Sequence, residues 1–114
     1  MSFQKDLLVI AASNGENLKL SKRFIDLAKE LKIKSELLDL THLDLPLYNP
    51  RTHSKEGIPA LVNSLNHQMA SVPRWIICAP EYNGSIPPVF SSALAWLSVQ
   101  EDDFRQLFNG RPIA

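Results

Sequence analysis

The chain has 114 residues, the size of one ordinary domain, and its 12 Lys and Arg are balanced by 12 Asp and Glu. A formal net charge of zero excludes the basic excess of a non-specific nucleic-acid binder, and 45% hydrophobic residues indicate a globular chain. The apolar run at 7–12 is too short to span a membrane, and we expect it not to belong to a signal peptide because no charged segment of that kind leads into it. A single cysteine, Cys78, forms no intrachain disulfide, so we expect a cytoplasmic protein.

Three units of strand, loop and helix follow one another along the chain. The apolar runs at 7–12 and 75–79 are typical of strands buried on both faces of a parallel sheet, and the less apolar 35–40 indicates an edge strand. Helical periodicity predicts a second helix at about 58–69 and a third that Pro87 and Pro88 open. The first helix is predicted by an apolar stripe, expected to face the core, at Leu20, Phe24, Leu27, Ala28 and Leu31.

The remaining segments complete the predicted organisation. The polar stretch 49–57 is interpreted as a mobile surface loop, and residues 111–114 as the start of a further strand. Alternating strands and helices predict a three-layer α/β fold with a parallel sheet. The strand order 2-1-3-4-5 agrees best with the sequence, because it places the apolar strands one and three at the centre of the sheet. We therefore expect a single flavodoxin-like domain over 1–114, of order 2-1-3, incomplete at its C-terminus because strands four and five are missing.

Ligands of such sheets bind outside the carboxyl ends of the strands, where the strand order reverses. The first loop at that point, residues 13–17, leads into a helix whose N-terminus favours an anion. Two interpretations fit this loop. It is a phosphate cradle, with Ser13, Asn14, Asn17 and Lys19 as contacts, or it is a plain helix cap, because Ser13 and Glu16 have capping-box spacing.

The second loop follows the third strand and combines an aromatic residue, a turn dipeptide and several prolines. Gly84 permits a positive φ and a close approach of the backbone to a flat ligand, and the prolines stiffen the loop. A tight Asn-Gly turn before a proline-capped helix explains part of this pattern as well. The candidate binding residues here are Pro80, Glu81, Tyr82, Asn83, Gly84 and Ser85.

The second loop, read through to Pro87 and followed by Ala93, Leu94, Trp96 and Ser98, resembles the signature of NADPH-dependent FMN reductases. The segment Leu45-Pro46-Leu47-Tyr48 and the stretch 109–114 resemble further parts of that family. The resemblance implies FMN as cofactor, NADPH or NADH as co-substrate and a small-molecule electron acceptor. It implies that the second loop wraps the flavin ring through its backbone, that the first loop holds the phosphate, and that no side chain is a catalytic nucleophile.

The resemblance also bears on assembly, because Phe90, Leu94 and Trp96 are similar to the surface through which family members form dimers. With the edge of strand 75–79 expected to be uncovered, we expect a homodimer or higher oligomer, with neither a nucleic acid nor a membrane as partner. Two alternatives to a reductase stay open. One is a flavodoxin-like electron carrier, and the other is a truncated, catalytically silent domain that acts by self-association.

The histidines, the cysteine and Trp75 are expected to have structural roles and no chemical function. His42, His53 and His67 lie far apart without metal-ligand spacing and are expected on the surface. Cys78 is expected to be a buried, inert thiol, and Trp75 to serve core or dimer packing.

Overall fold

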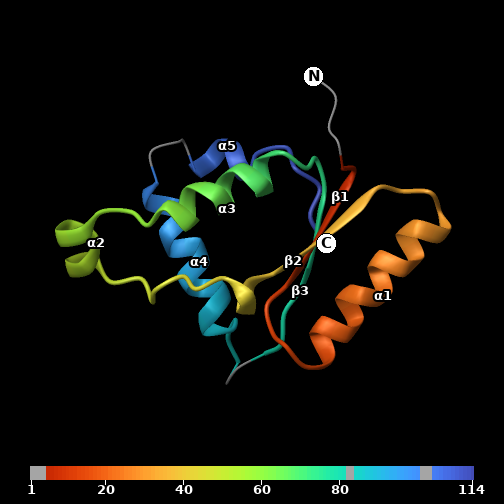
Figure 1. The fold of residues 1–114 in the computed structure, drawn as a ribbon, viewed down its shortest axis with the longest axis horizontal. Helices are drawn as coiled ribbons and strands as arrows, with labels where there is room; N and C mark the ends of the chain where they lie inside the picture. The colour runs from red at the N-terminus through yellow and green to blue at the C-terminus, as the bar shows by residue number, and fades with distance from the viewer. Residues whose placement is uncertain (1–4, 82–83, 101–103) are drawn as a thin grey trace.

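The computed structural model describes residues 5–81, 84–100 and 104–114, and Figure 1 shows their arrangement. The elements in chain order are β1 (Leu7–Ala11), α1 (Glu16–Glu30), β2 (Ser35–Asp39), a 3-10 turn (Leu40–His42), α2 (Pro50–Glu56), α3 (Ala60–Ala70), β3 (Trp75–Cys78), α4 (Pro88–Val99) and α5 (Phe104–Phe108). None of the helices in these ranges is long and apolar enough to cross a membrane.

The sheet is parallel and has the order β2-β1-β3, which confirms the predicted topology. β1 is central, as the apolar run predicts, and Ile10 lies in register with Leu38 on one side and Ile77 on the other. In-register neighbours share a face of a parallel sheet, so these three side chains form one apolar row.

The outer edge of β3 is partly paired, and the expectation of an uncovered edge is wrong over that part. The backbone N–H of Trp75 donates to the Pro112 carbonyl at 3.1 Å, and the N–H of Ile77 donates to the Ala114 carbonyl at 2.8 Å. Ile113 forms a parallel bridge with Trp75. The predicted start of a strand at 111–114 therefore forms, because the backbone groups of β3 offer it hydrogen-bond partners.

Arg111 holds this last segment in place. Its guanidinium carbon lies 4.5 Å from the centre of the Trp75 ring, its Nε donates to the Leu107 carbonyl at 2.7 Å, and its Nη1 donates to the Val72 carbonyl. Burial lowers the pKa of Arg111 below its usual value, because desolvation disfavours the charged form. The contacts bring the turn after α5 against the start of β3.

Helices cover both faces of the sheet, with α1 on one side and α3, α4 and α5 on the other (Figure 1). The main core lies on the side of α3 and α4, where Leu8 and Ile10 of β1 meet Leu65, Met69 and Leu97. Trp75 is 1% exposed in this core, and its Nε1 donates to the Met69 carbonyl at 3.0 Å. Trp75 thus serves core packing.

The buried face of α1 differs from the predicted apolar stripe. Ser21 and Ala28 are buried, whereas Leu20, Leu27 and Leu31 are 43%, 51% and 70% exposed. Small side chains at the contact let the helix backbone approach the strands, and the Ser21 hydroxyl is satisfied by donating to the Asn17 carbonyl at 2.7 Å. The periodicity identified the helix correctly. Ala28 of the predicted stripe is buried and Phe24 is half-buried, but the three leucines of the stripe are exposed.

The stretch interpreted as a mobile loop contains α2, so that prediction is wrong. The Asn49 side chain caps the helix by accepting the N–H of Arg51 at 2.9 Å, Pro50 occupies its first turn, and Gly57 ends it at φ 78°. Because α2 buries none of its residues, its sequence has no apolar stripe by which to recognise it.

Candidate flavin site

Two loops lie side by side where the neighbouring strands β1 and β3 end, on the lower side of the sheet in Figure 1. The N–H of Ala12, just after β1, donates to the carbonyl of Cys78 at the end of β3 at 2.9 Å. This bond fixes the starting points of both loops. The structure thus brings together residues 13–17 and the region after residue 79, as the predicted switch point requires.

The first loop leaves the N-terminus of α1 without a side-chain cap. Gly15, not Ser13, is the N-cap residue, and no side chain hydrogen-bonds to the first turn there, so the capping-box interpretation is wrong. Ser13 and Asn17 are half-buried and Asn14 is exposed. Backbone N–H groups at the start of a 15-residue helix, with the helix dipole behind them, make a favourable position for an anion.

Lys19 is not positioned as an unpaired cation of this loop. Its Nζ lies 3.1 Å from Oε1 of Glu16, and the two side chains are 75% and 87% exposed. An exposed ion pair of this kind contributes little to stability, so Lys19 is free to exchange partners. Glu16 also places a carboxylate in the first turn, where it competes with any bound anion for the same positive potential.

The second loop has a glycine in the conformation that its predicted role requires. Gly84 has φ 78°, and an added Cβ there would lie 3.9 Å from the Glu81 carboxylate. Pro80 is half-buried, whereas Glu81, Gly84 and Ser85 are exposed, so these three residues are accessible to a ligand. Tyr82 and Asn83 lie outside the described residues.

The exit from this loop is rigid. Pro87 is among the most completely buried side chains, and α4 begins at the next residue with Pro88 in its first turn. Cys78, just before the loop, is a buried free cysteine, as expected from its apolar neighbours. Both ends of the loop are therefore anchored in the core. The simple-turn interpretation and the ligand-loop interpretation both remain compatible with this geometry.

Next to α4, the segment 45–48 forms a wall that the sequence did not identify as part of a site. The Tyr48 N–H donates to Ser92 Oγ at 2.9 Å, and Nε1 of Trp96 donates to the Pro46 carbonyl at 2.7 Å. The rings of Tyr48 and Trp96 pack edge to face with centroids 4.9 Å apart. The apolar character of the segment Leu45-Pro46-Leu47-Tyr48 is the only feature of the sequence that indicates this contact.

Two expectations for side chains in this region are corrected. His53 is half-buried, not a free surface residue, because its ring packs against Trp96 with centroids 5.9 Å apart. Trp96 is fully buried, so its side chain cannot reach a dimer surface, whereas Phe90 and Leu94 are half-buried. His42 and His67 are exposed.

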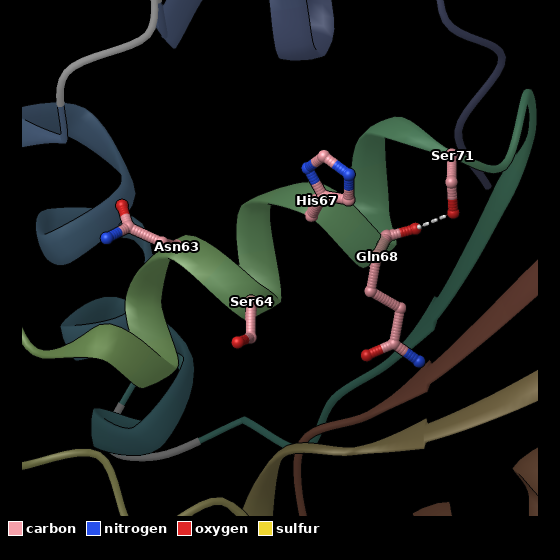
Figure 2. A pocket seen from close by; sticks show the side chains of 5 residues that line it. All are labelled: Asn63, Ser64, His67, Gln68 and Ser71. Atoms are coloured by element: carbon pink, nitrogen blue, oxygen red, sulfur yellow. Dashed lines mark hydrogen bonds between the residues drawn. The ribbon is translucent and has the colours of Figure 1, made fainter.

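Figure 2 shows a shallow hollow on α3, lined by five uncharged or weakly basic side chains. Ser71 Oγ donates to the Gln68 carbonyl at 2.8 Å, and Gln68 Nε2 donates to the Glu36 carboxylate at 2.8 Å. His67 points away from the strands in this view. The hollow extends to Ser71, near the amino end of β3, so it is separate from the two loops. Its lining residues are Asn63, Ser64, His67, Gln68 and Ser71.

The parallel sheet has the order 2-1-3 and is covered by helices on both faces, and two loops follow its strands at the switch point. These features define an α/β domain of the flavodoxin-like class. Residues 6–114 match the family model described as NADPH-dependent FMN reductase. The chain therefore belongs to the NADPH-dependent FMN reductase family.

Known relatives are flavoenzymes and reductases of greater length. A quinone reductase of Escherichia coli (strain K12) is 37% identical over 70 residues, which are 61% of this chain and 36% of that protein. The flavoenzyme NAD(P)H:(acceptor) oxidoreductase FerB from Paracoccus denitrificans superposes with a TM-score of 0.72 at 26% identity, over 96% of this chain and 58% of that one. An azoreductase from Bacillus anthracis str. Sterne shares the fold. It superposes with a TM-score of 0.66 at 18% identity, over 86% of this chain and 57% of that one. The chain spans little more than half of these structural relatives.

Proposed function

We propose that this chain carries the flavin-binding part of an NAD(P)H-dependent oxidoreductase that reduces a small-molecule acceptor such as a quinone. The observation that supports it most is the pair of accessible loops at the ends of β1 and β3, joined by the Ala12–Cys78 hydrogen bond. Family membership over residues 6–114 supports the same conclusion. When bound, FMN would supply the hydride chemistry between NADPH or NADH and the acceptor.

In this proposal the first loop binds the FMN phosphate. The N–H groups at the start of α1 face no side-chain cap, and Ser13, Asn14 and Asn17 add a hydroxyl and two amides at the same place. Lys19 contributes a positive charge when it leaves Glu16 for the phosphate. These residues fit a phosphate because they offer donors and keep one mobile cation close by.

The second loop binds the isoalloxazine ring in this proposal. Pro80, Glu81, Gly84 and Ser85 supply mainly backbone groups, because hydrogen bonds from a fixed backbone recognise the polar edge of a flat ring without bulky side chains. Tyr82 and Asn83 are proposed to lie beside the ring. The buried Pro87 keeps the loop in a fixed place relative to α4. The assembly is proposed to be a homodimer or a higher oligomer.

The test is a titration of the purified protein with FMN, followed by quenching of flavin fluorescence and by the yellow absorbance of the protein. We expect saturable binding at one site per chain, and oxidation of NADPH or NADH when a quinone is added. Riboflavin serves as the ligand control because it lacks the phosphate. A folded protein that binds neither FMN nor riboflavin would refute the flavin site and favour the catalytically silent alternative.

A further inference from the structure

One side of α1 carries a row of large apolar side chains that the described part of the chain leaves largely uncovered. Leu20, Phe24, Leu27 and Leu31 follow one another at intervals of four, three and four residues, which is the a/d spacing of a coiled coil. The three leucines are 43%, 51% and 70% exposed, and Phe24 is half-buried. These four residues, called the α1 seam below, form the kind of row that packs against a second helix.

The sheet beside α1 is also incompletely covered. Within the described ranges α1 alone lies on its face of the sheet, whereas α3, α4 and α5 share the other face (Figure 1). Val9 of β1 points to the α1 side, opposite to its neighbours Leu8 and Ile10, and it is completely buried. Leu37 and Ile76, which lie in register with Val9 on β2 and β3, are only half-buried. α1 therefore covers the middle strand and leaves apolar surface on the strands beside it.

The charges that border the seam identify the orientation of a second helix. Arg23 and Glu30 occupy the g positions on the solvent side, whereas Ser21 and Ala28 occupy the e positions and are buried against the sheet. Parallel helices oppose g to e, and the e positions here carry no charge. Antiparallel helices oppose g to g, which brings an arginine of one helix beside a glutamate of the other. The seam is therefore complementary in charge to an antiparallel copy of itself.

We propose that the α1 seam is a two-fold interface between two copies of this chain, in which the two α1 helices pack antiparallel. Leu20 of each copy packs on Leu31 of the other, and Phe24 of each copy packs on Leu27 of the other. In this register Arg23 of each copy lies beside Glu30 of the other, so the two-fold axis produces the ion pair twice. The apolar stripe predicted from the sequence thus serves contact between chains, which explains why its leucines are outside the core.

The first test is a disulfide that only this pairing permits. Arg23→Cys and Glu30→Cys are placed in the same full chain, seven residues or about 10.5 Å apart along one helix. A disulfide requires Cα atoms within roughly 7 Å, so the two new thiols bond only between chains. Cys78 is buried and does not compete. On mild oxidation at micromolar concentration we expect a covalent dimer as the main product.

The matched control has the same spacing on the opposite side of the helix. Lys22→Cys with Lys29→Cys again places two exposed thiols seven residues apart, but on the side of α1 that faces away from the seam. We expect this pair to stay monomeric in denaturing electrophoresis. Equal cross-linking by the two pairs, or no cross-linking of a folded Arg23→Cys, Glu30→Cys chain, would overturn the interface.

The second test removes the apolar contact while the reporter cysteines stay in place. Leu27→Asp, added to the Arg23→Cys, Glu30→Cys chain, loses a buried leucine at two equivalent places, which corresponds to an association weaker by roughly a hundredfold or more. The cross-linked fraction should fall to that of the control pair. Lys22→Asp in the same chain should leave it unchanged, and thermal unfolding checks that both variants are folded.

A cross-linked fraction that Leu27→Asp leaves unchanged would overturn the role of the seam. A lipid surface is the other occupant that this test detects, because basic side chains are also present on α1. Binding of the wild-type chain to phosphatidylglycerol vesicles, abolished by Leu27→Asp and without a cross-linked dimer, would overturn the pairing in favour of lipid. The result does not depend on flavin, so a chain that cross-links but binds no FMN overturns the proposed function alone.

Discussion

Replacing Glu16 by Gln should tighten the binding of FMN. Glu16 is the first residue of α1, next to the uncapped N–H groups that we propose for the phosphate, and its carboxylate also holds Lys19 at 3.1 Å. The variant removes a negative charge from the phosphate position and releases the lysine to it. The helix itself loses a favourable charge at its N-terminus, so stability should fall by about 0.3–1 kcal/mol while affinity rises.

The size of the gain follows from Coulomb's law in a solvent-exposed setting, since Glu16 is 87% exposed. At a separation of one helical turn, about 5.4 Å, two unit charges in water interact by about 0.8 kcal/mol. A phosphate of nearly two charges doubles this, and screening at physiological salt roughly halves it again. The expected gain is therefore about 0.8 kcal/mol, or roughly fourfold in affinity.

The assay is fluorescence titration with FMN and with riboflavin at 0.15 M and at about 1 M salt, where the Debye length falls to about 3 Å. At high salt the gain should shrink to less than about twofold. Glu30→Gln is the control, because it makes the same charge change in the last turn of the same helix. Equal tightening of riboflavin, an equal effect of the control, or unchanged FMN affinity at low salt would refute a phosphate at this helix terminus.

Three other substitutions test separate parts of the structure. Gly84→Val should weaken FMN binding by distorting the ring loop, whereas Gly57→Val, at the same φ of 78°, should cost stability but leave flavin affinity unchanged in the same titration. Ser13→Ala should lower FMN affinity about tenfold and leave riboflavin affinity unaltered, and equal losses would remove the phosphate assignment. Arg111→Met keeps an apolar stem against Trp75 but loses the donors to two carbonyls, so the free energy of unfolding, measured in urea, should fall by about 2 kcal/mol. An unchanged urea midpoint would mean that the contacts of Arg111 contribute nothing to stability.

The sequence by itself determined the topology of the sheet, and it predicted the two loops of the candidate site. Continuous apolar runs identified β1 and β3, and the helical spacing identified α1, α3 and α4. Right-handed crossovers between parallel strands left few possible orders. Gly84 is a residue type that permits a positive φ, and its φ is 78°. These features depend on neighbouring residues or on a periodic pattern, so the sequence alone is enough to predict them.

Other features depended on which surfaces meet. The sequence predicted five apolar positions on the core side of α1, but packing fully buries only Ala28 among them. It buries Ser21 in addition, because small side chains allow a close approach to the strands. Likewise, the cap spacing around Ser13 was compatible with a capping box, but the backbone placed Gly15 at the cap and paired Lys19 with Glu16.

The contacts between residues far apart in sequence belong entirely to the tertiary structure. The bonds from α4 to Pro46 and Tyr48 span 50 and 44 positions, and they turn an apolar segment into a fixed wall with Leu47 facing outward. No periodic pattern encodes such a pairing, because its partners are set by how the chain returns across α4. Whether an apolar side chain is core or surface is decided only when every neighbouring element has taken its place.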